Sequence, residues 1–226
     1  MRKAGWVAVC AAVVFAAAGG GVTAALAGGT VHDPAPAAAP EHPSADSADA
    51  GFARDMAVHH QQAVEMSFVV RDRTDDEEVR RLAYDIANTQ ANQRGMMLGW
   101  LDLWGLPKVS AGPPMAWMDM GDMDDMPGME HGSGHGGGQE ADHDGALMPG
   151  MATKAELARL AKADGERAEV LFLKLMTEHH KGGVHMAQGC VDQCRPGVER
   201  DLAEGMVTAQ ESELRLMADL LKARGA

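Results

Sequence analysis

The sequence predicts an all-α protein, a four-helix bundle built from two duplicated helical hairpins that are joined by a loop rich in Met, His and Gly. Three observations lead to this prediction. Residues 48–105 and 152–226 each carry apolar side chains at helical spacing. The second block repeats the first at a constant offset of 120 residues. A single hairpin cannot bury its apolar stripe alone, so the two copies are expected to pack together.

The repeat extends over thirteen positions without a gap. It retains a pair of adjacent histidines and, 31 residues after the first of them, a glutamine. A register that keeps both features indicates a duplication. The matched pairs are Phe52/Phe172, Met56/Met176, His59/His179, His60/His180, Val64/Val184, Met66/Met186, Asp72/Asp192, Arg80/Arg200, Leu82/Leu202, Ala83/Ala203, Gln90/Gln210, Met97/Met217 and Leu101/Leu221.

The chain begins with a targeting segment over residues 1–27. Arg2 and Lys3 give a positive start, an apolar stretch follows, and Ala25-Leu26-Ala27 resembles a small-residue cleavage site. The segment is therefore either a cleaved signal peptide or a membrane anchor through residues 5–27. Both alternatives place the remaining chain outside the cytoplasm. Residues 28–47, rich in Ala and Pro, are expected to be a linker.

In the first hairpin, a helix is expected over residues 48–71. Thr74-x-x-Glu77 resembles a capping box that opens a second helix, and Gly105 with Pro107 closes it. In the second hairpin, Thr153-x-x-Glu156 opens a short helix that Asp164-Gly165 interrupts. A long helix over 166–190 follows, and Pro196 suits the first turn of the last helix.

The adjacent histidines lie on the predicted core face of each first helix. On a helical wheel they share one arc of about 120° with two methionines, whereas His185 lies opposite and is expected to face solvent. The residues on this face are Met56, His59, His60 and Met66 in one copy and Met176, His179, His180 and Met186 in the other. Imidazole and thioether are ligand types that suit copper, so these eight residues are candidate metal ligands.

The second helices carry polar residues on their apolar faces, Gln90 and Gln93 in one copy and Gln210 and Glu213 in the other. A buried amide or carboxylate without a partner costs roughly 1–3 kcal/mol, and the imidazoles are the natural partners. A side chain that holds one ring nitrogen leaves the other nitrogen free for a metal. The alternative is a buried His/Gln network that only fixes helix register.

The loop over residues 106–151 combines Gly, Pro, Asp, Met and His. Thioether sulfur is a soft ligand that selects Cu(I), and closely spaced methionines allow several sulfurs to reach one ion. The candidate ligands here are Met118, Met120, Met123, Met126, Met129, His131 and His135. The alternative is a linker of biased composition.

Two cysteines, Cys190 and Cys194, remain once the targeting segment is set aside. An even pair in an oxidising compartment favours a disulfide, and the spacing of four residues places it where a helix ends. A thiolate pair that binds a metal is the alternative.

The net charge and the missing motifs argue against several classes of function. The net charge of -13 argues against nucleic acid as a partner. Neither core copy contains the Glu-x-x-His pattern of di-iron bundles. The chain also has no phosphate loop and no plausible catalytic triad, so we expect no enzyme.

The doubled motif resembles the domain of unknown function 305 family. The resemblance covers residues 50–222, and the matching stretches are 172–187 (FLKLMTEHHKGGVHMA), 210–217 (QESELRLM), 56–66 (MAVHHQQAVEM), 90–101 and 148–151 (MPGM). It implies a ferritin-like four-helix bundle in exported or membrane-anchored proteins, some of them associated with copper binding and tolerance, and no established activity. This chain departs from the pattern at Gln93, where the family usually has Glu, and at Gly182-Gly183.

Three functions follow from these patterns. The first is an extracytoplasmic protein that binds or buffers a soft metal, with Cu(I) favoured. The second is a structural or interaction bundle without a metal role. The third, an oxidoreductase that uses a bound metal, has no sequence feature of its own.

Overall fold

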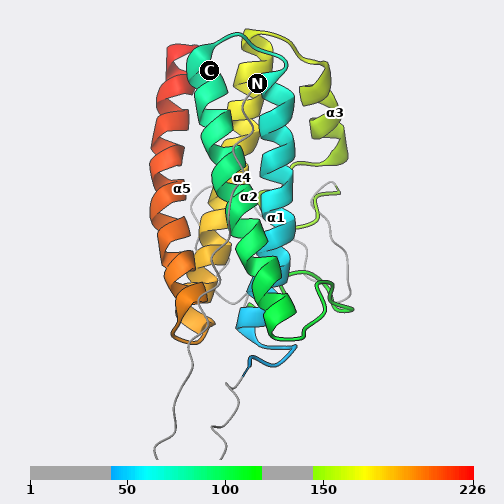
Figure 1. Ribbon diagram of the computed structural model, residues 1–226. Coiled ribbons are helices and arrows are strands. Elements are labelled where there is room, and N and C mark those ends of the chain that lie inside the picture. The colour runs from blue at the N-terminus through cyan, green and yellow to red at the C-terminus, as the bar shows by residue number, and fades with distance from the viewer. Residues whose placement is uncertain (1–41, 119–144) are drawn as a thin grey trace, which may run out of the picture. The chain divides into compact units, whose positions relative to one another are not determined.

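The computed structural model describes residues 42–118 and 145–226, and this part of the chain contains five helices and no strand. The helices are α1 (Ala48–Arg71), α2 (Glu77–Leu103), α3 (Lys154–Lys162), α4 (Glu166–Gln193) and α5 (Val198–Ala223). The four long helices form an antiparallel bundle in which α1 and α5 run upward and α2 and α4 run downward, with the short α3 beside α1 (Figure 1). The predicted all-α bundle is confirmed.

Each hairpin packs on itself, α1 against α2 and α4 against α5, and the two hairpins meet through α1 and α4. No helix among the described residues is long and apolar enough to cross a membrane. The predicted targeting segment over 1–27 and most of the predicted linker lie outside the described residues.

Side chains of the connecting segments set where the helices begin. Ser47 caps α1 by accepting a hydrogen bond from the Ala50 amide, and Thr153 opens α3 with the predicted capping box. The predicted Thr74 cap of α2 is wrong, because Asp76 accepts the bond from the Val79 amide at 2.9 Å. Thr74 instead donates its hydroxyl to the buried Glu169 of α4, which ties the two hairpins together.

The connection between α4 and α5 contains a disulfide between Cys190 and Cys194. Cys190 lies in the last turn of α4. Cys194 follows the helix in an extended conformation, from which its sulfur reaches that of Cys190. The connection takes up residues 194–197, so Pro196 precedes α5 and does not occupy its first turn as predicted.

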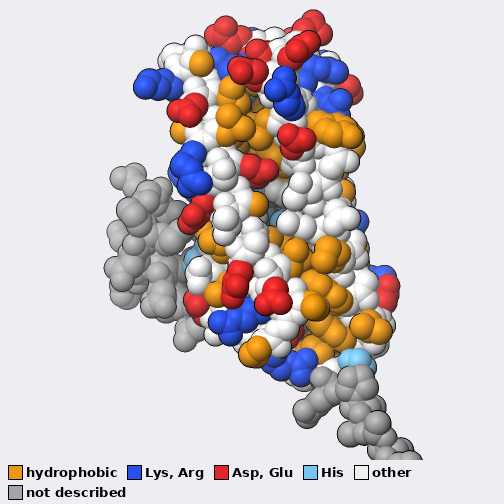
Figure 2. Space-filling model, turned by 60° about the vertical axis from the view of Figure 1, so that its left-hand side comes forward, with side chains coloured by type: hydrophobic (Ala, Val, Ile, Leu, Met, Phe, Trp, Pro, Cys, Tyr) orange, Lys and Arg blue, Asp and Glu red, His pale blue; other side chains and the backbone are white. Residues whose placement is uncertain are grey.

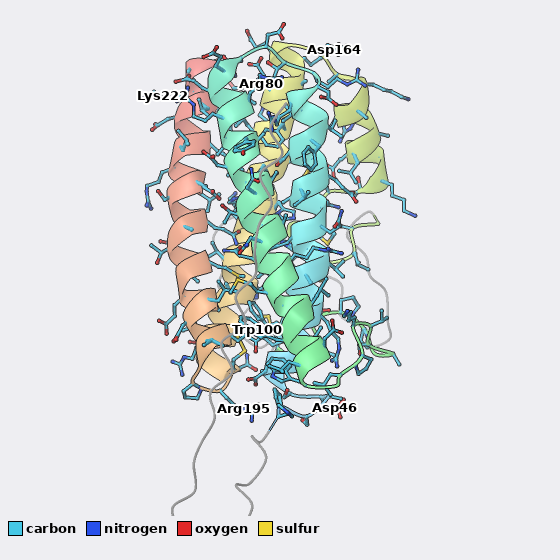
Figure 3. The ribbon with its side chains drawn as sticks, viewed as in Figure 1. Asp46, Arg80, Trp100, Asp164, Arg195 and Lys222 are labelled. Carbon is cyan, nitrogen blue, oxygen red and sulfur yellow. A yellow bond between two sulfur atoms is a disulfide. The ribbon has the colours of Figure 1, made fainter. Side chains whose placement is uncertain are left out.

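The core consists of two clusters of buried apolar side chains at opposite ends of the bundle. The lower cluster, which includes Phe52, Met97, Met186 and Met206, lies at the end marked by Asp46 and Arg195 in Figure 3. The upper cluster includes Ile86, Phe172 and Met217. On the face shown in Figure 2, charged side chains gather most densely at the upper end, and apolar side chains extend along the face below it.

Candidate metal centre

Four fully buried histidines lie on the helices that join the two hairpins. His59 and His60 come from α1 and His179 and His180 come from α4, and none of the four is accessible to solvent. They occupy the middle of helices whose ends contribute to the lower and upper clusters. This burial agrees with the predicted core face, and we call the four residues the histidine layer.

The two hairpins meet at His59 and His179, which are equivalent positions of the 120-residue repeat. Their rings lie 3.8 Å apart between centroids and are tilted by 35°. His179 donates from Nε2 to the carbonyl oxygen of His59 at 2.9 Å. His59 donates from Nε2 to the carbonyl oxygen of Pro149 at 3.3 Å, a partner that lies before α3.

The other two histidines pair with polar side chains of the second helices, as predicted. The Nε2 atom of His60 lies 2.8 Å from Oε1 of Gln93, and that of His180 lies 2.6 Å from Oε2 of Glu213. The Glu213 side chain is 23% exposed, so this pair connects the layer to the surface. The layer is therefore asymmetric, with an amide partner in one copy and a carboxylate partner in the other.

These partners fix which ring nitrogen carries the donated proton. Carbonyl and carboxylate oxygens only accept hydrogen bonds, so Nε2 is protonated in each ring, and in a neutral ring Nδ1 then carries a lone pair. All four Nδ1 atoms are buried without a hydrogen-bond partner. A buried polar atom without a partner costs about 1–3 kcal/mol. A bound cation, to which a nitrogen lone pair can coordinate, would remove this cost.

Burial also disfavours the charged form of three of the rings, those of His59, His60 and His179. It lowers the pKa of His59 and of His60 to about 3, with the neighbouring imidazoles adding repulsion. Burial lowers the pKa of His179 well below its usual value, again with repulsion from nearby rings. A metal binds neutral imidazole, so His59, His60 and His179 are in the ligating form at neutral pH.

The four candidate methionines of the core face are fully buried on both sides of the layer. Met56 and Met186 belong to the lower cluster, and Met66 and Met176 belong to the upper cluster. Between residues 42 and 226, leaving out 119–144, no group of three or more His, Cys, Asp or Glu side chains is arranged to hold a metal ion. A surface cavity of about 340 Å³, lined partly by Arg54, Pro107 and Trp117, touches none of the histidines.

The other predicted polar pair, Gln90 and Gln210, is buried but makes no hydrogen bond to an imidazole. Both amides lack partners for their nitrogen and oxygen atoms. The Gln210 amide packs against Gly183, where an added Cβ would lie 2.4 Å from the amide oxygen. Gly183 therefore makes room for the Gln210 side chain inside the bundle.

Residues 148–153, which we call the strap, cross α1 and α4 beside the layer. Gln62 holds the strap through both amide atoms, accepting from the Ala152 amide at 2.6 Å and donating to its carbonyl at 2.9 Å. At Gly182 an added Cβ would lie 2.2 Å from the Pro149 carbonyl oxygen, and Gly150 has a φ of 78°. The strap is not among the features predicted from the sequence, although the glycines in α4 were a signal for such a close approach.

The Met-rich loop is described only at its ends. Met118, a candidate ligand, is buried in the lower cluster, where it packs against Gly189. The other loop candidates, namely Met120, Met123, Met126, Met129, His131 and His135, lie outside the described residues.

His185 was expected to face solvent but is half-buried, and its Nε2 atom is enclosed. It lies three residues after Gly182 and four before Gly189, and therefore on the helix face that the strap and Met118 cover.

The chain is similar in sequence and fold to proteins of one known family. The profile of a family described as "Domain of unknown function (DUF305)" matches residues 49–221. A DUF305 protein from Streptomyces coelicolor, provisionally described as secreted, is 64% identical, with a TM-score of 0.68 over 81% of this chain and 97% of that one. A DUF305 fragment from Deinococcus radiodurans is 32% identical, with a TM-score of 0.58 over 78% and 96%.

A more distant structure is CopM in its Cu(I)-bound form. It is 20% identical, with a TM-score of 0.53 over 77% of this chain and 96% of that one, so the likeness shows a common fold. CopM also has structures in a Cu(II)-bound form and in Ag-bound forms. No curated protein matches this chain.

Proposed function

Since the chain belongs to the DUF305 family, we propose that it binds a soft metal ion, foremost Cu(I), in the histidine layer of its bundle. The observation that carries this proposal is the set of four buried Nδ1 atoms without partners. Each of these rings is fixed through its Nε2 atom by an oxygen acceptor, which is how proteins orient metal-binding imidazoles.

The chemistry of the surrounding residues favours a soft monovalent ion. Imidazole and thioether suit copper, and among the described residues no carboxylate, the ligand that a hard cation would prefer, bonds to any of the four Nδ1 atoms. Neutral rings bind the ion without first losing a proton. CopM, which shares the fold, binds Cu(I), Cu(II) and Ag.

We place this binding outside the cytoplasm and consider it storage or buffering. A disulfide persists in oxidising compartments, and the relative from Streptomyces coelicolor is provisionally described as secreted. An ion held between packed helices is shielded from solutes, which suits retention of cargo better than turnover.

A structural module is the second candidate, and two observations favour it. No three-residue group of His, Cys, Asp or Glu within the described residues is arranged for a metal. The hydrogen bonds of His60 and His180 also bridge paired helices, which fixes their register. In this alternative the Nδ1 atoms have no ligand role.

Replacement of His179 by Gln separates the two functions. The side-chain amide nitrogen of Gln is separated from Cα by as many bonds as the Nε2 atom of His. The substitution therefore keeps a donor for the His59 carbonyl and removes the Nδ1 lone pair. We expect His179→Gln to fold and to lose at least tenfold in Cu(I) affinity, measured anaerobically against a competing chelator. His185→Gln is the matched control in the same helix, and its affinity should equal that of the wild type.

Equal affinity of His179→Gln and wild type would contradict metal binding by this ring. Circular dichroism of both variants checks that the helix content is retained.

A further inference from the structure

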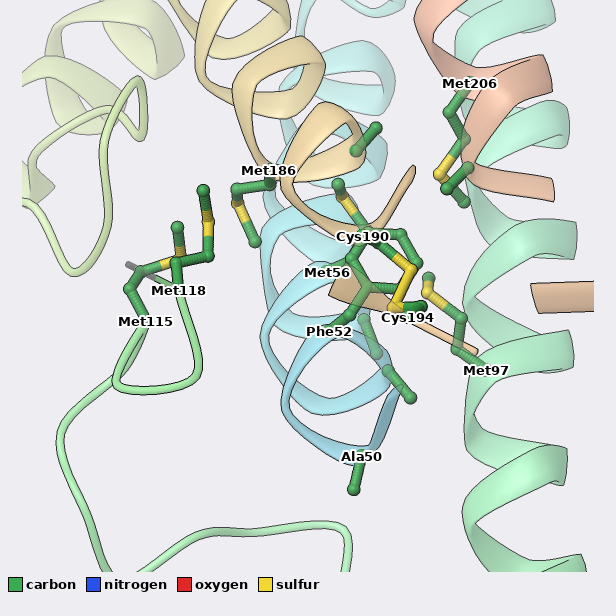
Figure 4. Close-up of a cluster of buried hydrophobic side chains, with 14 of the residues drawn as sticks. Ala50, Phe52, Met56, Met97, Met115, Met118, Met186, Cys190, Cys194 and Met206 are labelled. Carbon is green, nitrogen blue, oxygen red and sulfur yellow. A yellow bond between two sulfur atoms is a disulfide. The ribbon is translucent and has the colours of Figure 1, made fainter. Parts of the chain in front are cut away.

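Sulfur is concentrated at one end of the bundle. Among the described residues, nine of the 16 buried members of the lower cluster carry sulfur, compared with three of the 15 members of the upper cluster. The nine are Met56, Met97, Met115, Met118, Met148, Met186, Cys190, Cys194 and Met206. Methionine alone is ordinary core filling, but this cluster also contains Cys190 and Cys194 (Figure 4).

The disulfide lies inside this cluster and not on the surface. Cys190 is fully buried and Cys194 is 4% exposed. Figure 4 shows the Met97 side chain extending from α2 towards the disulfide. Thiolate and thioether sulfur are the softest ligands that proteins offer, and together they select Cu(I).

We infer that Cys190 and Cys194, once reduced, form a second soft-metal site with Met97, and that the disulfide is the closed form of this site. An external dithiol reductant supplies two electrons and two protons, so the S–S bond breaks, two thiols form and the reductant becomes a disulfide. A monovalent ion then replaces both thiol protons, which pass to solvent, and takes two thiolates and one thioether as ligands.

The local structure allows this change without unfolding the helix. The disulfide joins residues only four positions apart, so its loss releases little chain entropy. Cys194 already lies beyond the end of α4 in an extended conformation, so its sulfur can separate from that of Cys190 while the helix is retained. A cavity of about 290 Å³, lined by Asp49, Trp104 and residues 195–199, borders the segment that directly follows Cys194.

This inference rests on the proposed function only in the choice of ion, since the two sites use different residues. The histidine layer is complete in both redox states, whereas the sulfur site exists only after reduction. The two proposals therefore fail independently.

The test compares oxidised and reduced wild-type chain in an anaerobic Cu(I) titration against a competing chelator. The reduced chain is prepared with a dithiol that is then removed. We expect it to take up one more equivalent of Cu(I) than the oxidised chain and to show a thiolate-to-copper charge-transfer band. Bound Cu(I) should also protect both cysteines from alkylation, measured by mass spectrometry.

Met97→Leu and Met217→Leu form a matched pair, because the two methionines are equivalent in the repeat but Met217 belongs to the upper cluster. Met97→Leu should lower the affinity of the additional equivalent about tenfold, and Met217→Leu should leave it unchanged. Equal stoichiometry of the oxidised and reduced chains would overturn the site, whatever the histidine layer binds. An equal effect of the two leucine variants would overturn the role of Met97.

Discussion

Gly182→Ala should destabilise the protein although the same change at most helical glycines stabilises it. Gly182 lies in the middle of α4, where glycine costs roughly 1 kcal/mol relative to alanine. Its added Cβ would lie 2.2 Å from the Pro149 carbonyl oxygen and 3.1 Å from the Gly150 Cα atom. Both contacts are with backbone, so the strap must move away from α4.

The magnitude follows from three contributions. Overpacking of a tight contact costs about 1–3 kcal/mol. Displacement of the strap weakens the two hydrogen bonds between Gln62 and Ala152, each worth about 1 kcal/mol. Subtracting the gain in helix propensity leaves a net loss of about 2 kcal/mol, which for a chain of this size lowers the Tm by about 4–8 °C.

Urea unfolding followed by circular dichroism measures this change. Gly205→Ala is the control, because Gly205 lies in α5 with nothing within 4 Å of its added Cβ. It should raise the free energy of unfolding by about 0.5–1 kcal/mol. The reasoning is refuted if Gly182→Ala is as stabilising as Gly205→Ala.

Three further predictions concern charge. Burial lowers the pKa of His59 and His60 to about 3, so both rings stay neutral in the folded protein at pH values where the unfolded chain takes up protons. Their contribution to the free energy of unfolding is therefore full above pH 6.5 and is lost as pH falls towards 3, by up to about 1.4 kcal/mol per pH unit for each ring. Acid unfolding curves should show this slope. Burial, followed by the charge of Asp49, raises the pKa of Glu199 to about 9, so stability is full below pH 4.5 and falls as pH rises. Glu199→Gln should therefore be more stable than wild type at pH 7, by up to about 3 kcal/mol in thermal unfolding, and a lower Tm would contradict the assignment. Glu213→Gln should weaken Cu(I) binding about tenfold and Gln93→Glu should strengthen it, because a carboxylate partner makes an imidazole a more basic ligand; opposite shifts in chelator competition would exclude this role.

The sequence predicted the helices and the buried histidines because both depend on local periodicity. Apolar residues at helical spacing fix which face of α1 and α4 is buried, and His59 and His179 lie on that face. The pairing of His60 with Gln93 and of His180 with Glu213 was predictable for the same reason, since each acceptor lies on the inner face of the neighbouring helix.

The strap was not predictable because irregular backbone has no period. The acceptor of His59 is a carbonyl of Pro149, 90 residues away, and no pattern in the sequence specifies that contact. The cap of α2 was misplaced for a related reason, because the Thr74 hydroxyl is engaged by Glu169 from the other hairpin. Long-range contacts of this kind override local capping preference. Gly182 and Gly183 in mid-helix are a local signal of close contacts, because glycine costs a helix stability, but the sequence alone does not specify which segment makes those contacts.

The most direct test of metal binding by the histidine layer is nitrogen NMR of the imidazole rings during titration of the oxidised chain with Ag(I), a diamagnetic soft ion. Without metal, His59, His60 and His179 should show protonated Nε2 and unprotonated Nδ1 atoms. One equivalent of Ag(I) should shift the Nδ1 resonance of at least two core histidines and split it by coupling to silver, while His185 stays unchanged. Unchanged Nδ1 resonances in all four rings, with or without shifts of methionine methyl groups, would contradict metal binding by the layer.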